Sequence, residues 1–448
     1  MKKFSIHFIV VNFILCFYFI DLWSNAQNNS RGLPIVSYYE NGNIYFDKYQ
    51  DKTCDKSIVA GHIYSDKAPL PTFVALPIYG LLSKVGIIDI KSEKNKFNNI
   101  YAIGGILCGS LPFFLLIYLS FTNVLNRINY KELNFSAILL TMLPWYGSFL
   151  FIYTGTFFGH LFSGVLMLGA YIFYKKQKLF YCGLLAGLSV ISEYTLVLIP
   201  VIWGLQTLFQ QKTIKKLLPM FLGACPGIVF ILTYNFLITS SPFDNLYNHV
   251  SADYSTPNYG FLFPTLTSIF GLTFSVYRGL FIFMPILFFA LLIYLKNIRL
   301  SNVKYLFLHP IIFPAIILFF VISANHMWWG GWCFGPRHLT VVAILLGYET
   351  IPYLIEKGYN KILLWSFIAF GLIISIATKI TLQYSFPTDI KNAITEALIP
   401  AFFKWDFNNN NLLSQSFAID NAYSAAVWVL LLLSSIIALK QFFVKVCK

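Results

Sequence analysis

Apolar runs long enough to cross a membrane follow one another through most of the 448-residue chain, and this feature most limits how it can fold. About 20 apolar residues suffice for a transmembrane helix, because a bilayer core is ~30 Å thick and a helix rises ~1.5 Å per residue. Such runs lie at about 4–23, 100–122, 135–153, 156–173, 218–237, 276–295, 304–323, 338–355, 361–382 and 424–441. The sequence therefore predicts an all-α polytopic membrane protein.

The composition supports this interpretation. Hydrophobic residues make up 57% of the chain and charged residues only 11%, which is more apolar surface than a soluble domain of this length could bury. The formal net charge of +14 suggests nucleic acid as a partner. However, the basic residues form small clusters between apolar runs rather than one stripe, which is typical of cytoplasmic loops. No nucleic-acid partner is expected.

Lysine and arginine in the short loops predict the orientation, because such residues are retained on the cytoplasmic side. The clusters are Lys2/Lys3, Arg127/Lys131, Lys175/Lys176/Lys178, Lys212/Lys215/Lys216, Lys296/Arg299/Lys304, Lys357/Lys361 and Lys440/Lys445/Lys448. The apolar stretch 181–207 has basic residues on both flanks, so it must cross an even number of times. We expect a hairpin of two short helices with Glu193 at its outer tip. This gives about twelve crossings of the cytoplasmic (inner) membrane, with both termini cytoplasmic.

The long polar segments then all fall on the outer face. They are residues 24–99, 238–275, 324–337 and 383–423. We expect one transmembrane domain, 1–448, with no separate soluble domain. Residues 24–99 form a large first outer loop in which the stretch 72–88 supplies helices lying in the membrane interface. The first apolar run is long for a cleaved signal peptide, so an uncleaved anchor is expected.

Three arginines lie outside, against the positive-inside tendency, in a chain that otherwise uses lysine. They are Arg31, Arg278 and Arg337. A guanidinium binds phosphate through two parallel hydrogen bonds, which a lysine cannot copy. Together with Lys67, these arginines predict an anionic ligand at the outer leaflet. The alternative is pairing with nearby acids or lipid headgroups.

Acids of the first loop are candidates for a general base. Asp66 lies in "HIYSDKAPLP", flanked by Tyr64 and Lys67, where two prolines restrict the backbone. Asp55, in "CDKS", is the second candidate. Glu193 either faces the same cavity or makes a hydrogen bond that holds its hairpin.

The segment "NHMWWGGWCFGPRHL", 325–339, combines tryptophans with glycines that permit tight turns close to a ligand. His326, Trp329 and Trp332 are therefore assigned to a cavity, together with His160 after the turn 155–159. His326 and His338 could bind a divalent metal, but no HxxxH or HxxE spacing supports such a site, so a metal is possible and unsupported by the sequence. A Cys54–Cys333 disulfide on an oxidising face is left open.

Several segments in order resemble one family. "YSDKAPL" (64–70) is similar to the Tyr-x-acid-Lys-Pro-Pro-Leu motif of GT-C membrane glycosyltransferases, in the branch that holds protein O-mannosyltransferases and aminoarabinose transferases, family 39 and its bacterial relatives. Further matches are "YTGTFFGH" (153–160), "GLLAGLSVISEYT" (183–195), "YNFLITSSPF" (234–243), "FGLTFSVYRGLFIFMP" (270–285) and "WWGGWCFGPRHL" (328–339). Together they cover nearly the whole chain.

The resemblance implies a GT-C-like bundle and an inverting sugar transfer at the outer leaflet. The donor would be a polyprenyl-phosphate-linked sugar, and the acceptor an envelope lipid, glycan or protein. Arg31, Lys67, Arg278 and Arg337 would hold the phosphate of the lipid, and Asp66 or Asp55 would activate the acceptor hydroxyl. The loop 238–265 and "WWGGW" would shape the cavity.

One part of the family pattern differs. The family has Asp-Glu-x-Arg just after the first helix, and this chain has Asn28-Asn29-Ser30-Arg31. An amide cannot accept a proton at neutral pH. Either another acid is the base, or the correspondence is shifted, or the chain is a non-catalytic relative acting in envelope assembly. A transporter or flippase for a lipid-linked sugar would also fit the bundle and the outer arginines.

Overall fold

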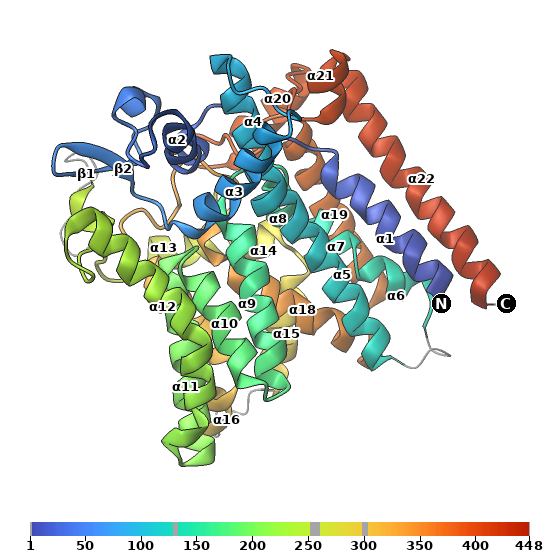
Figure 1. Cartoon of the computed structure of the whole chain (residues 1–448). Helices are drawn as coiled ribbons and strands as arrows, with labels where there is room; N and C mark the ends of the chain where they lie inside the picture. The colour runs from blue at the N-terminus through green and yellow to red at the C-terminus, as the bar shows by residue number, and fades with distance from the viewer. Residues whose placement is uncertain (1, 129–132, 251–259, 298–302, 448) are drawn as a thin grey trace.

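The computed structural model describes the chain except for residues 1, 129–132, 251–259, 298–302 and 448. Lys131, Arg299, Lys448 and part of the 238–265 loop lie outside the described residues. The described chain is a bundle of helices, so the all-α prediction is confirmed (Figure 1). Among the described residues, five helical stretches are long and apolar enough to cross a membrane: Glu93–Arg127, Leu218–Thr239, Arg337–Lys357, Lys361–Ile380 and Asn421–Lys445.

The remaining bundle helices are shorter. They include α1 (Lys2–Phe17), α9 (Gly159–Lys175), α10 (Leu179–Val190), α11 (Leu198–Gln211), α15 (Leu287–Asn297), α16 (Val303–Leu308) and α17 (Ile312–Ser323). Helix α5 (Leu111–Arg127) ends the long helical stretch that begins at Glu93, and the other long helices are α12 (Leu218–Thr239), α18 (Thr340–Lys357), α19 (Lys361–Ile380) and α22 (Asn421–Cys447). The later polar segments contain short helices: α13 (Leu266–Thr273), α20 (Ile399–Phe403) and α21 (Leu412–Phe417).

Three apolar runs are interrupted where one helix each was expected. The run 135–153 forms α6 (Phe135–Leu140), α7 (Leu143–Tyr146) and α8 (Phe149–Ile152). The break after α7 falls at Gly147, whose carbonyl oxygen would lie 2.3 Å from a Cβ on Gly371. The other two runs break near Pro285, after α14 (Leu280–Phe283), and near Pro310, before α17. Proline removes a helical hydrogen bond and interrupts the helix. Hydropathy alone therefore overestimates the lengths of these helices.

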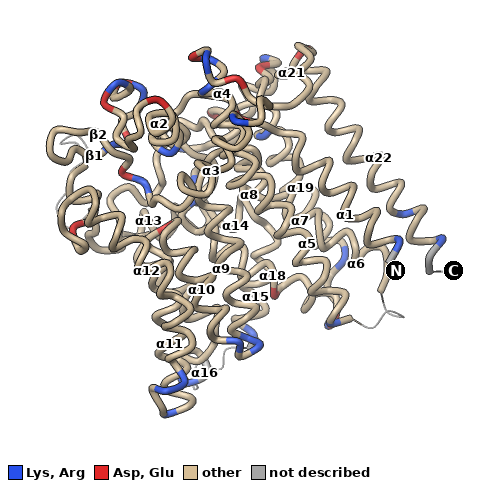
Figure 2. The backbone as a smooth tube through the Cα atoms, in the orientation of Figure 1, with Lys and Arg blue, Asp and Glu red and all other residues tan. Residues whose placement is uncertain are grey.

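The start of α1 and the end of α22 lie close together (Figure 1). The even number of crossings stays a prediction. Helices α1 and α22 pack together along their length, with the rings of Phe4 and Phe443 5.5 Å apart and the Trp428 indole donating to the Leu15 carbonyl at 3.1 Å. Lysines and arginines gather at this end and at the end of α11 and α16, whereas acids and bases mix at the opposite end (Figure 2). This is the charge distribution that the loop clusters predict.

Two short helices surround Glu193, as the sequence predicts. Helix α10 ends at Val190, and a 3₁₀ turn, Tyr194–Val197, leads into α11. Glycines let α10 and α12 approach closely, because a Cβ on Gly183 would lie 1.9 Å from the Met220 carbonyl oxygen. The hairpin is thereby packed on α12, and Glu193 is held at the polar end of the molecule.

The first polar segment folds into α2 (Ala26–Asn41), the strands β1 (Lys56–Val59) and β2 (His62–Ser65), α3 (Leu70–Lys84) and α4 (Glu93–Gly105). The strands form an antiparallel hairpin in which Lys56 faces Ser65. The two turn residues, Ala60 and Gly61, have φ of 50° and 82°, which matches the twist of a two-residue hairpin. Helix α2 is buried from Asn28 to Ser37 against α3 and α4, so its polar residues face protein.

Candidate active site

A lysine lies between two aspartates where the hairpin ends. Asp66 directly follows β2, and Pro69 and Pro71 start α3 just beyond it. The Lys67 Nζ lies 3.1 Å from Asp55 Oδ2 and 3.1 Å from Asp66 Oδ2. All three side chains are buried for the most part. The two predicted acids and the predicted lysine therefore meet at one point.

One face of α2 completes this cluster. The Gln27 amide donates to Asp55 Oδ2 at 3.0 Å, and the Ser30 hydroxyl donates to Asp66 Oδ1 at 3.3 Å. Arg31 donates to the Gln27 side-chain oxygen at 2.6 Å. Residues three and four apart share a helix face, which explains why positions 27, 30 and 31 all face this cluster. We call Asp55, Asp66, Lys67 and Arg31 the acid–base cluster.

The two aspartates differ in their electrostatic surroundings. Burial raises the pKa of Asp66 and the neighbouring Asp55 carboxylate adds to this, so the pKa stays above its usual range despite Lys67 and Arg31. Burial also acts to raise the pKa of Asp55, but Lys67, Arg337 and Arg31 outweigh it and lower the pKa. Burial opposes the charge of Lys67, yet the two carboxylates raise its pKa. Asp66 is thus the stronger base, and Asp55 the more firmly ionised acid.

Arg337 approaches the cluster from the segment before α18. Its charge acts on Asp55, and its guanidinium carbon lies 5.9 Å from the centre of the Phe158 ring. A Cβ on Gly330 would lie 3.1 Å from its Nε, so the glycine turn makes room for the arginine. The Nε atoms of Arg31 and Arg337 are buried and have no hydrogen-bond partner within the described chain. Buried donors of this kind are rare unless a ligand completes them.

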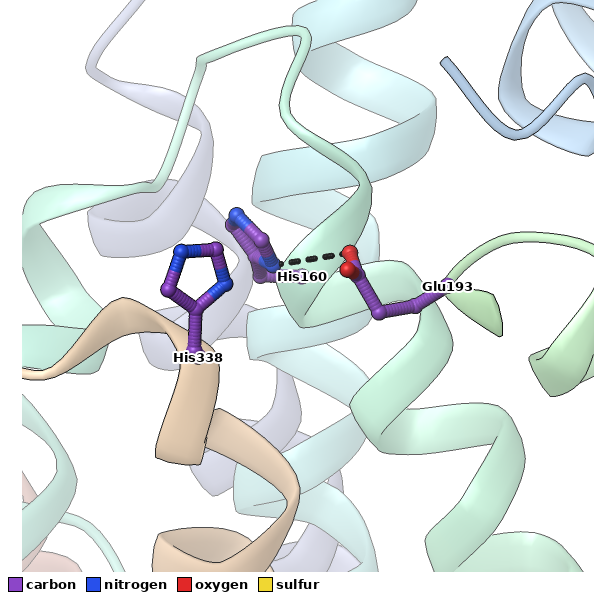
Figure 3. Close-up of side chains that lie close together, drawn as sticks. All are labelled: His160, Glu193 and His338. Atoms are coloured by element: carbon purple, nitrogen blue, oxygen red, sulfur yellow. Dashed lines mark ion pairs between the residues drawn. The ribbon is translucent and has the colours of Figure 1, made fainter. Parts of the chain in front are cut away.

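A second group of side chains consists of His160, Glu193 and His338 (Figure 3). The His160 Nδ1 and Glu193 Oε2 atoms are 3.0 Å apart, and the ring of His338 lies 5.5 Å from that of His160. His160 is the second residue of α9, which follows a turn at Gly155 with φ of 72°. A Cβ there would lie 2.4 Å from the Phe19 carbonyl oxygen, so only glycine fits. A Cβ on Gly159 would lie 3.4 Å from Arg31 Nη2, which places the two groups side by side.

Arg278 occupies a different environment from the other outer arginines. It is fully buried. Its Nη1 donates to the Tyr277 carbonyl at 3.0 Å, and its Nη2 lies 3.3–3.4 Å from the carbonyls of Gly331, Phe386 and Pro387. These contacts tie the tryptophan–glycine segment to the segment after α19. Its Nε is buried without a hydrogen-bond partner among the described residues, as in Arg31 and Arg337, so the phosphate role of Arg278 stays a prediction.

The remaining predicted cavity residues lie around the site rather than in the cluster. The rings of Tyr64 and Tyr45 are 6.1 Å apart on the hairpin side. Within the described residues, His326 Nδ1 and Trp329 Nε1 are buried without a hydrogen-bond partner, whereas Trp332 is 60% exposed. Cys54 is exposed, Cys333 is buried, and both are free thiols, so the disulfide left open by the sequence is not formed.

The two asparagines in place of the family's acids are part of a hydrogen-bond network. The Asn28 amide donates to Asp21 Oδ2 at 3.1 Å and to the Trp23 carbonyl at 3.0 Å, and its oxygen accepts from the Phe157 N–H. Asn29 donates to the Lys52 carbonyl and accepts from Tyr101. A carboxylate at position 28 would face the Asp21 carboxylate and a carbonyl. The amide is therefore required here, and the acids of the cluster come from elsewhere.

Asp21 escapes sequence reasoning, and so do the partners of His338. Asp21 is buried and accepts from the Tyr384 hydroxyl at 2.8 Å, which joins the end of α1 to the segment after α19. An acid at the end of the first apolar run was the available signal. His338 stands in the sequence next to Arg337, but its convergence with His160 and Glu193 depends on three separate segments. No local spacing could reveal it.

Comparison with known proteins gives one distant structural likeness. No family model matches the chain, and no curated protein matches it. A solved structure of the archaeal oligosaccharyltransferase AglB from Archaeoglobus fulgidus, in complex with an inhibitory peptide and a dolichol-phosphate, matches with a TM-score of 0.46 and 11% identity. The match covers 93% of this chain and 57% of that one, so this chain spans little more than half the length of that protein.

Proposed function

We propose that this chain is an integral membrane glycosyltransferase of the GT-C type. It transfers a sugar from a polyprenyl-phosphate donor to a hydroxyl group of an envelope lipid, glycan or protein on the outer face of the cytoplasmic membrane. The observation that carries the proposal is the acid–base cluster with Arg337 beside it. Buried carboxylates and buried cations meet there, and two guanidinium Nε atoms have no partner within the described residues.

The cations are suited to the phosphate of the donor. Arg31, Lys67 and Arg337 lie near one another at the polar end, and two of them present planar guanidinium groups. The donor phosphate is a diester with one negative charge, and it gains a second when the sugar leaves. Fixed cations in a buried site stabilise that developing charge and so lower the barrier.

The carboxylates are suited to the acceptor. The acceptor oxygen attacks the anomeric carbon, the bond from that carbon to the phosphate oxygen breaks, and the bonding pair leaves with the phosphate. The proton of the acceptor hydroxyl passes to Asp66, whose raised pKa makes it the better base. Asp55 remains ionised and holds Lys67 in place. Two carboxylates in different surroundings thereby have different roles, as is common in enzymes that act on sugars. Attack opposite the leaving phosphate inverts the anomeric carbon.

The test is transfer of a labelled sugar from a polyprenyl-phosphate donor by membranes that contain the chain. We expect the wild type to transfer sugar and Asp66→Asn to fail. Asp51→Asn is the matched control, because Asp51 is an exposed acid of the same loop outside the cluster. If the wild type moves the labelled lipid between leaflets without any transfer, the chain is a flippase. If it does neither, the amides at 28 and 29 mark a non-catalytic partner in envelope assembly.

A further inference from the structure

Three potential metal ligands converge beside the acid–base cluster. One ligand atom each from His160, Glu193 and His338 lies within 4.8 Å of the other two (Figure 3). They come from three parts of the chain: the start of α9, the turn between α10 and α11, and the segment before α18. Packing of the bundle, rather than any local motif, brings them together.

A simple ion pair accounts for only part of this arrangement. His160 and Glu193 satisfy each other at 3.0 Å, and such pairs are common without a metal. His338 is different, since its ring has no hydrogen-bond partner in the described part of the chain and faces the pair edge-on. A Cβ on Gly330, whose φ is 78°, would lie 3.2 Å from His338 Nε2, so the adjoining turn favours glycine where it approaches this ring. The His338 imidazole packs against the histidine–glutamate pair without a hydrogen bond of its own. It is therefore available as a third metal ligand.

We propose that His160, Glu193 and His338 bind one divalent transition-metal ion, with Zn²⁺ the best match. Two imidazole nitrogens and one carboxylate oxygen are a donor set that Zn²⁺ prefers, whereas Ca²⁺ and Mg²⁺ prefer all-oxygen sites. Three protein ligands leave a fourth tetrahedral position open to water or another oxygen donor. The proposal does not depend on the glycosyltransferase assignment, because ion binding is measured without any turnover.

The charges around the site decide what the fourth ligand is. The charges of Arg31 and Arg337 both act on His160, and the charge of Arg31 also acts on Glu193. Glu193 alone does not neutralise a divalent ion beside two guanidinium groups. An anionic oxygen donor in the open coordination position neutralises part of this excess positive charge. We therefore expect inorganic phosphate, used as a probe, to tighten binding of the ion by about tenfold, the effect of ~1.4 kcal/mol.

The decisive variant is His338→Ala, because it removes a ligand without removing a hydrogen bond between described residues. The full chain, purified in detergent and stripped with a chelator, is dialysed against Zn²⁺, and bound metal is counted by elemental analysis. We expect one ion per chain for the wild type and a loss of affinity of about 100-fold or more for His338→Ala. His62→Ala is the matched control, since His62 pairs with Asp47 on the exposed hairpin.

Co²⁺ provides a second measurement that does not depend on folding stability. Bound at this site it should give the visible absorption bands of a four-coordinate ion, and His338→Ala should lose them while its gel-filtration profile and Tm without metal match the wild type. No stoichiometric metal in the wild type, equal affinity in His338→Ala, or an equal loss in His62→Ala would each overturn the assignment.

Discussion

Two carboxylate clusters at different places in the molecule differ in how completely their groups are paired. Glu349, on α18, accepts from Arg127 at 2.6 Å, from Lys175 at 2.9 Å and from the Tyr171 hydroxyl at 2.8 Å. One acid thus joins α5, α9 and α18, and its oxygens are all used. The acid–base cluster instead has acids with unequal pKa values and a guanidinium whose Nε is unpartnered within the described chain.

The difference separates structural charges from functional ones. A carboxylate with three donors from neighbouring helices stabilises the packing of those helices and has nothing left for a ligand. Buried groups left incomplete cost free energy, about 1–3 kcal/mol each, unless a ligand completes them. Perturbed, incomplete groups are therefore the better candidates for catalysis, and the predictions below use the Glu349 cluster as the reference.

The largest expected effect is on the rate of sugar transfer in Asp66→Asn. Loss of a general base typically costs about 10²–10⁴ in rate, and the amide keeps the size of the side chain. Initial rates with labelled donor measure this. Glu349→Gln should retain transfer within a few-fold. A Glu349→Gln variant that lost as much activity as Asp66→Asn would erase the distinction between the two clusters.

The next effect is on donor affinity in Arg31→Lys. A lysine keeps the charge but loses the planar pair of donors, so we expect the KM for the donor to rise about 10–100-fold, with a smaller change in kcat. Arg127→Lys is the matched change in the Glu349 cluster and should leave KM unchanged. A fall in kcat with constant KM for Arg31→Lys would argue against a phosphate ligand.

The sequence predicts the features of the fold and of the candidate site that depend on local residue pattern. Apolar runs gave the membrane helices, and loop lysines gave the two charged ends. "YSDKAPL" identified Asp66 and Lys67, and the interruption of 181–207 gave the turn at Glu193. These are short-range features, in which a residue's neighbours in the chain determine its environment.

Pairings between distant segments could not be predicted. The sequence places Arg278 outside, and only the fold shows that its Nη2 contacts backbone carbonyls more than 50 residues away. The sequence pattern of Arg127 is that of a loop charge, although its partner Glu349 lies 222 residues further along the chain. His338 reaches His160 in the same way. Each of these depends on which helices pack together, a property that hydropathy does not contain.

A smaller effect is expected on the free energy of unfolding. Substitution in the Glu349 cluster should lower it more than substitution in the acid–base cluster. Glu349→Gln leaves Arg127 and Lys175 without their carboxylate, and because these groups are partly exposed we expect a loss of about 1–2 kcal/mol. This corresponds to a fall in Tm of a few degrees in detergent, read by thermal unfolding. Asp66→Asn should change Tm less. The opposite order would mean that the acid–base cluster serves to hold the fold.

The smallest expected effect is on the pH profile of sugar transfer, which distinguishes the roles of Asp55 and Asp66. Asp66 must be ionised to accept a proton, and its raised pKa places the fall in activity on acidification above the usual range of an aspartate. Asp55→Asn removes a negative charge that raises the pKa of Asp66, so the acidic limb of the pH profile should move to lower pH.

The groups that act on Asp66 in this comparison are Lys67, Asp55 and Arg31, with the Ser30 hydroxyl as a hydrogen-bond donor. Only Asp55 changes in the variant, so the direction of the shift isolates its charge. Asp51→Asn should leave the limb in place. If instead Asp55 were the base, Asp55→Asn would abolish transfer at every pH and Asp66→Asn would merely displace the limb. The same two variants therefore decide which carboxylate takes the proton, a question that rate measurements at a single pH would leave unanswered.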